Sequence, residues 1–185
     1  GLGLGCRARQ ACIHSLARVM VDTDAGQGHD DAMSDGARIV QISVSPGGVP
    51  KRAVTLARVT TMGVQGDAQR NRTHHGGPER ALCLFSQDRI RALQSEGHPI
   101  EPGSIGETLT IEGIDWSQVT PGVYLRLGDE VVAEVTRYTS FCFNIWASFH
   151  DGDESRVSQK RHPGNSRVYA RMLREGSITT GDPVR

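Results

Sequence analysis

Hydrophobic and polar residues alternate along much of the chain beyond residue 38, a period that is typical of β-strands with one buried face. Such runs, and short apolar runs bounded by turn residues, predict strands at residues 39–44, 54–59, 81–85 and 108–112. The clearest pair is 123–127 with 131–135, because Gly128-Asp129 is a favourable turn between two alternating runs. We therefore expect a β-hairpin there.

Three segments instead space their apolar residues by three or four, as an amphipathic helix does. Residues 86–95 begin with the capping residue Ser86, and residues 166–175 end before Gly176, which favours a helix stop. The third helix is predicted at residues 142–149, where one apolar face would carry Cys142, Ile145, Trp146 and Phe149.

Many short strands and few helices, without regular strand–helix alternation, predict a mainly β fold: a β-barrel with a few short flanking α-helices. The 185 residues are enough for one domain with its own core. We expect this domain to span residues 33–185. Residues 1–32 are then a poorly ordered N-terminal extension that is native, a targeting peptide or an artefact, and its deletion should leave thermal stability unchanged.

The charge balance narrows the range of partners. The 21 basic and 21 acidic residues cancel, so attraction to nucleic acid or to an anionic membrane is not a property of the whole chain. No apolar run approaches the roughly 18 residues that span a bilayer. The four cysteines lack CxxC spacing, which argues against a zinc ribbon or a disulfide framework. We expect a cytoplasmic protein that binds a small-molecule substrate, with no nucleic-acid or membrane partner.

Cys142 lies where a thiol is most reactive, near the start of a predicted helix that Ser140 can cap. The positive end of the helix dipole favours the thiolate, which attacks electrophiles or binds a soft metal. A buried cysteine that fills core space is the alternative. Cys83 differs, because it lies mid-strand between Leu82 and Leu84, where we expect burial to raise its pKa.

Three glycine-rich segments, residues 63–77, 102–107 and 158–167, carry side chains that can bind or react. Glycine lets the backbone approach a ligand, and exposed amides bind anions. The N-terminus of the last predicted helix would favour an anion near the third segment. A hairpin loop and a solvated charge run are the alternatives for the first and third segments. The candidate side chains are Asp67, Arg70, Arg72, His74, His75, Glu107, Lys160, Arg161 and Arg167.

Taken together and in this order, the motifs resemble the MOSC domain, which forms the C-terminus of molybdenum cofactor sulfurases. The resemblance spans residues 47–185. Thr108 stands where the family usually has asparagine, and Phe141 stands where proline is frequent. The matching elements are Gly66-Asp67-x-Gln69, His74-His75-Gly76-Gly77, Arg80-Ala81-Leu82-Cys83, Gly106-Glu107-x-Leu109-Thr110, Gly128-Asp129, Cys142, Ser166-Arg167-x-Tyr169-Ala170-Arg171 and Gly181-Asp182.

The resemblance implies the molybdenum cofactor (molybdopterin) as ligand, while pyridoxal phosphate remains open. Cys142 would bind the metal or carry a persulfide, and His75, Asp67 and Glu107 would transfer protons or support the metal ligand. The anionic cofactor would be bound by cations and glycine-rich backbone at Lys51, Arg52, Arg70, Arg72, Gly76, Gly77, Lys160, Arg161 and Arg167.

The function implied is a reductive or sulfur-transfer reaction through a cysteine thiolate, with N-hydroxylated compounds as one substrate class. A reductase of this kind needs an electron-donor protein, because the sequence contains no flavin or iron–sulfur motif. Two alternatives remain: a sulfur carrier in which Cys142 holds a persulfide, and a module that binds small anions or a partner enzyme.

Overall fold

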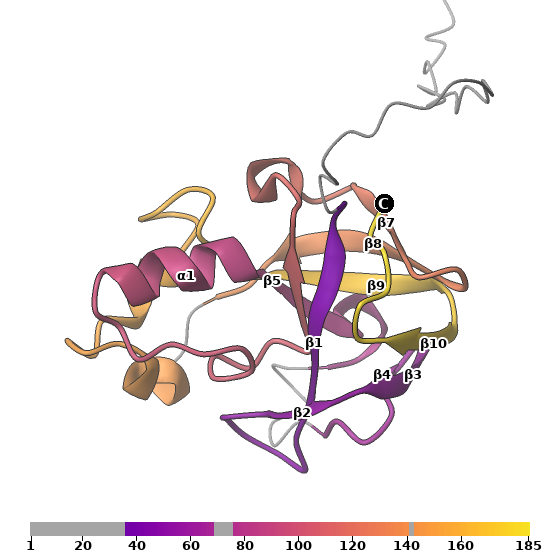
Figure 1. The fold of residues 1–185 in the computed structure, drawn as a ribbon, viewed down its shortest axis with the longest axis horizontal. Coiled ribbons are helices and arrows are strands. Elements are labelled where there is room, and N and C mark those ends of the chain that lie inside the picture. Colours follow the sequence, from indigo (N-terminus) through magenta and orange to yellow (C-terminus); the bar gives the residue numbers. More distant parts are fainter. Residues whose placement is uncertain (1–35, 69–75, 141–142) are drawn as a thin grey trace, which may run out of the picture. The chain divides into compact units, whose positions relative to one another are not determined.

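The computed structural model describes residues 36–68, 76–140 and 143–185. Seven strands form one mixed sheet in the order β2-β1-β6-β5-β9-β8-β7, in which every neighbouring pair is antiparallel except β5 with β6 (Figure 1). The fold is mainly β, as predicted. The strands of this sheet are β1 (Arg38–Val44), β2 (Arg52–Val54), β5 (Leu82–Ser86), β6 (Leu109–Glu112), β7 (Tyr124–Leu127), β8 (Val131–Tyr138) and β9 (Val168–Arg174).

The predicted hairpin is confirmed, since β7 pairs with β8 from Leu127↔Val131 to Tyr124↔Glu134. The strands predicted at residues 39–44, 81–85 and 108–112 are also present, as β1, β5 and β6.

A second, three-stranded sheet has the order β10-β3-β4, with β3 at Leu56–Thr60, β4 at Gly63–Val64 and β10 at Gly176–Thr179. The prediction of a single strand at residues 54–59 is wrong. Val54 pairs with β1, whereas Leu56 pairs with β10, so the chain passes from one sheet to the other at Thr55. Apolar and polar residues continue to alternate through Val54, Thr55 and Leu56. For that reason the sequence pattern did not reveal the break between the two strands.

Helix α1 (Gln87–Ser95) is the one α-helix among the described residues, and it lies beside the large sheet (Figure 1). It begins as predicted, because the Ser86 hydroxyl accepts hydrogen bonds from the backbone N–H groups of Asp88 and Arg89. Its buried face includes Ile90 and Leu93. Four short 3-10 helices complete the described elements: η1 (Pro78–Arg80), η2 (Trp116–Gln118), η3 (Phe143–Ser148) and η4 (Glu154–Val157).

The helix predicted at residues 166–175 is wrong, because this segment forms β9 inside the large sheet, between β5 and β8. Val168, Ala170 and Met172 are buried while the residues between them are less so, which is a period of two. A spacing of four fits both periods, and hydrogen bonding to two neighbouring strands decides for the strand. The helix N-terminus that was predicted to favour an anion therefore does not exist.

The helix predicted at residues 142–149 is a short 3-10 helix, η3. Ile145 and Phe149 are buried, so part of the predicted apolar face is confirmed. Trp146 is 49% exposed and stacks on Phe143, whose side chain is 73% exposed, with 6.2 Å between ring centroids. Cys142 itself lies outside the described residues.

The core is one apolar cluster to which both sheets and α1 contribute. Strand β5 is buried along its whole length, and it runs parallel to β6 with Leu84 opposite Leu109. This register makes Cys83 and Thr108 neighbours at the centre of the sheet. The segment that leads into β6 is therefore held in the interior, and it carries Glu107.

The C-terminal residues join β1 to β7. The N–H groups of Gly181 and Val184 donate to the carbonyls of Ile39 and Ala37, and Arg126 and Arg185 exchange two backbone hydrogen bonds. Strand pairing nevertheless defines two sheets and not a closed barrel, so the barrel stays a prediction. No helix in the described part of the chain is long and apolar enough to cross a membrane.

Candidate functional site

Four of the predicted site residues gather around Cys83. Lys51, Asp67, Glu107 and Arg167 come from four separate segments, yet the charge of each lies close enough to influence the pKa of the Cys83 thiol. Two of these residues are basic and two carry carboxyl groups. The fold thus brings together candidates that are up to 116 positions apart in the sequence.

Lys51 and Asp67 form a buried ion pair. The Lys51 Nζ lies 2.6 Å from Asp67 Oδ2, and the two side chains are only 9% and 1% exposed. Asp67 Oδ1 accepts a hydrogen bond from the Ser45 backbone N–H at 2.9 Å. Asp67, which follows β4, therefore ties the β1–β2 loop in place and neutralises the charge of Lys51.

Glu107 is fully buried, two residues before the start of β6. Its Oε1 accepts hydrogen bonds from the Gly103 backbone N–H at 2.6 Å and from the Thr110 hydroxyl at 3.3 Å. Its Oε2 has no hydrogen-bond partner among the described residues. Burial raises the pKa of this carboxyl, although the Gly103 hydrogen bond and the charge of Arg167 oppose the shift. The raised pKa shifts the equilibrium toward the neutral carboxylic acid, whose O–H is able to donate to a ligand.

Arg167 connects the candidate segments. It is 6% exposed and lies directly before β9. One guanidinium nitrogen, Nη1, donates to the Ile105 carbonyl, and Nη2 makes a long contact of 3.5 Å with the Ser140 carbonyl. Its Nε is buried with no partner among the described residues. Arg167 thereby links the segment that carries Glu107 to the chain that leads into Cys142.

Glycine 103 allows these segments to approach closely. A Cβ at Gly103 would lie 2.8 Å from the Lys51 carbonyl oxygen, closer than real Cβ contacts, and its φ of +84° also favours glycine. The Lys51 backbone N–H donates to the Gly103 carbonyl at 2.9 Å, while the Gly103 N–H donates to Glu107. A larger residue at Gly103 would separate Lys51 from Glu107.

Thr108 and Cys83 hold the neighbouring segments of the large sheet together. The Thr108 hydroxyl accepts from the Cys83 N–H and donates to the Cys83 carbonyl, each at 2.9 Å, so it is not turned toward a ligand. Burial raises the pKa of the Cys83 thiol to about 11, with Arg167 and Lys51 acting in the opposite direction. This confirms the expectation for Cys83, which is a thiol at neutral pH.

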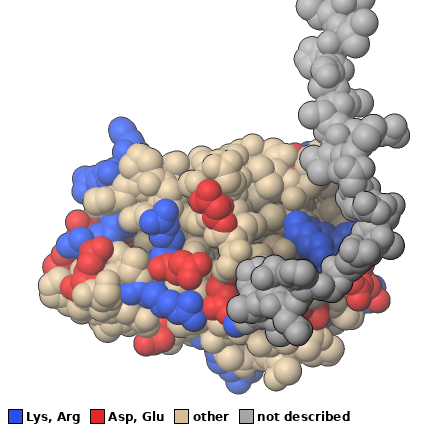
Figure 2. All heavy atoms as spheres, turned by 45° about the horizontal axis from the view of Figure 1, so that its top comes forward, with Lys and Arg blue, Asp and Glu red and all other residues tan. Residues whose placement is uncertain are grey.

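The remaining predicted cations within the described residues are exposed. Arg52 is an exposed residue of β2, and Lys160 and Arg161 are exposed on the segment after η4, where Arg161 donates to the Ser155 hydroxyl. The described contacts include none between the side chains of these three residues and those of Asp67, Glu107 or Arg167. On the face drawn in Figure 2, basic and acidic side chains are interspersed rather than gathered into one patch.

Several candidates lie outside the described residues: Cys142, His75, Arg70 and Arg72. Their roles stay predictions. Gly76 and Gly77, which follow them in the first glycine-rich segment, both have positive φ, of 84° and 82°. A Cβ at Gly77 would meet no described atom within 4 Å, so glycine is needed there for its backbone conformation and leaves open space.

The chain is similar to proteins of a known family. The MOSC domain model matches residues 71–185. The uncharacterized protein YflK of Bacillus subtilis is 30% identical over 132 residues, which are 71% of this chain and 57% of YflK. A protein of Gibberella moniliformis named reductase is 29% identical over 127 residues, which are 66% of this chain and 22% of that protein. The chain thus spans little more than half of the one relative and about a fifth of the other.

The fold has a counterpart among solved structures. The crystal structure of YiiM from Geobacillus stearothermophilus matches with a TM-score of 0.64 and 22% identity, covering 80% of this chain and 73% of that one. At this identity the likeness concerns the fold. The family model goes further, because it matches more than half of the chain, and it shows that this chain belongs to the MOSC domain family.

Proposed function

We propose that this protein binds the molybdenum cofactor and uses a Cys142 thiolate in a reductive or sulfur-transfer reaction. Family membership supports the cofactor, and the fungal relative named reductase supports the redox class. The observation on which the proposal chiefly rests is the position of Arg167, which is buried between the Glu107 segment and the chain entering Cys142.

The buried cluster fits an anionic ligand that offers hydrogen-bond acceptors. Arg167 Nε–H and Glu107 Oε2 are buried without partners among the described residues. Each unsatisfied group of this kind costs about 1–3 kcal/mol, and a ligand that pairs with both removes this cost. The phosphate-bearing pterin of the cofactor has this chemistry, so the residues present fit it.

The roles of the side chains follow from their environment. Arg167 supplies the buried positive charge that holds the anionic ligand, because Lys51 is already paired with Asp67. Glu107, in its neutral form, donates a hydrogen bond from Oε2. We assign Asp67 the positioning of Lys51, since its two oxygens bind Lys51 and the Ser45 backbone N–H.

Cys142 is the proposed metal ligand, because Cys83 is held as a buried thiol. When bound, the cofactor supplies two-electron redox chemistry at a sulfur-coordinated metal. Reduction of an N-hydroxylated compound then consumes two electrons and two protons, and releases the amine and water. His75 is the proposed proton donor, and the electrons come from a donor protein or domain.

The C-terminal segment connects strands that lie far apart in the order of the large sheet. Residues 181–185 lie between β1 and β7, to which they are joined by backbone hydrogen bonds. We infer that this segment closes the large sheet into a barrel-like framework, with the Glu107 segment held at its interior.

Metal and pterin analysis of protein from a host that makes the cofactor tests the proposal. We expect molybdenum and pterin in the wild type and in Cys83→Ala, and a lower molybdenum content in Cys142→Ser. Cys83→Ala is the matched control, since it removes a thiol that we do not expect to bind metal. Wild-type protein without molybdenum or pterin would contradict the proposal, and sulfane sulfur on Cys142 in such protein would identify the sulfur carrier instead.

A further inference from the structure

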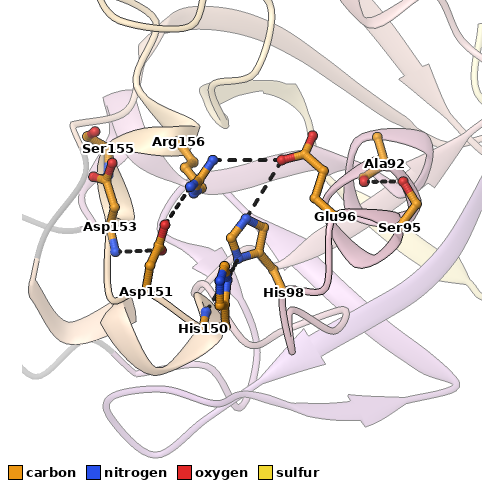
Figure 3. Close-up of polar contacts among 9 residues, drawn as sticks. All are labelled: Ala92, Ser95, Glu96, His98, His150, Asp151, Asp153, Ser155 and Arg156. Carbon is orange, nitrogen blue, oxygen red and sulfur yellow. Dashed lines mark hydrogen bonds and ion pairs between the residues drawn. The ribbon is translucent and has the colours of Figure 1, made fainter.

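A second cluster of ionisable side chains lies where the segment after α1 meets the segment after η3. His98 comes from the first segment, and His150 and Asp151 come from the second (Figure 3). The His98 side chain is 1% exposed, and its Nδ1 lies 3.0 Å from Nδ1 of His150. Ligand atoms of the three residues all lie within 4.8 Å of one another.

The facing ring nitrogens suit a shared cation. Zn–N bonds of about 2.0–2.1 Å at the tetrahedral angle place two ligand nitrogens about 3.3 Å apart, close to the 3.0 Å between the two Nδ1 atoms. The His150 backbone N–H also points at His98 Nδ1, at 3.3 Å, which is long for a hydrogen bond and easily given up. Asp151 is an exposed turn residue, and one of its carboxylate oxygens lies within 4.8 Å of a ring nitrogen of each histidine.

The surrounding groups are those that support metal ligands in proteins. Glu96 Oε2 lies 3.7 Å from His98 Nε2, the ring nitrogen that faces away from His150 (Figure 3). A carboxylate behind a histidine orients the ring and raises its basicity as a ligand. Arg156 Nη2 binds Asp151 Oδ2 at 2.5 Å and the Asp153 backbone N–H donates to Asp151 Oδ1 at 3.1 Å, so each carboxylate oxygen keeps one lone pair for a metal.

We propose that His98, His150 and Asp151 form a binding site for a divalent transition metal of the Zn²⁺ class. Two imidazoles and one carboxylate are the nitrogen and oxygen ligands that such ions accept, and the fourth tetrahedral position is left to water. The bound ion fixes the end of η3 to the segment after α1. Because η3 follows Cys142 directly, the site stabilises the segment that carries the proposed thiolate, although metal binding here does not depend on the function of Cys142.

Titration of the full chain with Zn²⁺, after removal of metal by a chelator, tests this site. We expect the wild type to bind one equivalent that His150→Ala loses, with affinity reduced at least tenfold. Glu96→Gln should weaken binding by about ten- to a hundredfold, since Glu96 acts on the ring of His98. His162→Ala is the matched control, because His162 is exposed and lies outside the cluster.

Co²⁺ as a probe separates this site from binding to cysteine. Co²⁺ held by the cluster should give visible d–d bands without the near-ultraviolet charge-transfer band of a thiolate ligand, and Asp151→Asn should weaken these bands. Equal affinity and stoichiometry in His150→Ala and His162→Ala would overturn the proposal. A Co²⁺ spectrum dominated by thiolate charge transfer, unchanged in His150→Ala, would overturn it as well.

Discussion

Replacing Glu107 by alanine or by glutamine separates its hydrogen-bonding role from its charge. Alanine removes the acceptor of the buried Gly103 N–H, which costs about 1–3 kcal/mol. Loss of packing adds to this cost, while removal of the unpartnered Oε2 offsets part of it. We therefore expect Glu107→Ala to lower the free energy of unfolding by about 2 kcal/mol, or the melting temperature by about 4–8 °C. Glutamine keeps the acceptor and the volume, so its effect should be less than about 1 kcal/mol near pH 5.

The effect of Glu107→Gln should depend on pH. Because burial raises the pKa of Glu107, the folded state keeps a proton that the unfolded state releases above its ordinary pKa of 4.5. The stability that this proton contributes is present below pH 4.5 and is lost as the pH rises through the raised value. Glutamine does not titrate, so Glu107→Gln should gain stability relative to the wild type as the pH rises.

Urea unfolding of the three proteins between pH 5 and 8 measures both effects. The reasoning is refuted if Glu107→Gln is as destabilising as Glu107→Ala at pH 5, because the hydrogen bond to Gly103 would then not explain the loss. It is equally refuted if the difference between wild type and Glu107→Gln is the same at every pH.

Three further changes test other parts of the structure. Lys51→Met should lower the free energy of unfolding by about 3 kcal/mol, since it removes the cation of a buried ion pair; an effect below about 1 kcal/mol in urea unfolding would contradict the buried pair. Ser86→Ala should cost about 1 kcal/mol through loss of the α1 cap, and no change in the urea midpoint would contradict this. Iodoacetamide near pH 7 should modify Cys142 before Cys83, as peptide mass spectrometry can show; faster modification of Cys83 would contradict its burial and raised pKa.

The sequence predicted the elements whose signals are local. The β7–β8 hairpin follows from two alternating runs around Gly128-Asp129, and α1 follows from the capping residue Ser86. Val168 and Met172 were misleading, because their spacing fits both a helix and a strand, and only pairing with β5 and β8 decides between them. Thr55 gave no signal that the chain changes sheets there.

The candidate site could be predicted only in part, for a similar reason. The motifs named Asp67, Glu107 and Arg167, and the fold brings these together around Cys83. The motifs did not indicate that Lys51 is neutralised by Asp67, since ion pairs between distant segments depend on how the loops cross. The same holds for His98 and His150, which are 52 positions apart and lie in no common motif.

The coordination of molybdenum in the loaded protein tests the central claim most directly. X-ray absorption at the molybdenum edge counts the sulfur atoms bound to the metal, and it can compare the wild type with Cys142→Ser. We predict that the variant loses one Mo–S interaction while Cys83→Ala retains the wild-type number. An identical number of sulfur ligands in wild type and Cys142→Ser would contradict the assignment of Cys142 as the metal ligand.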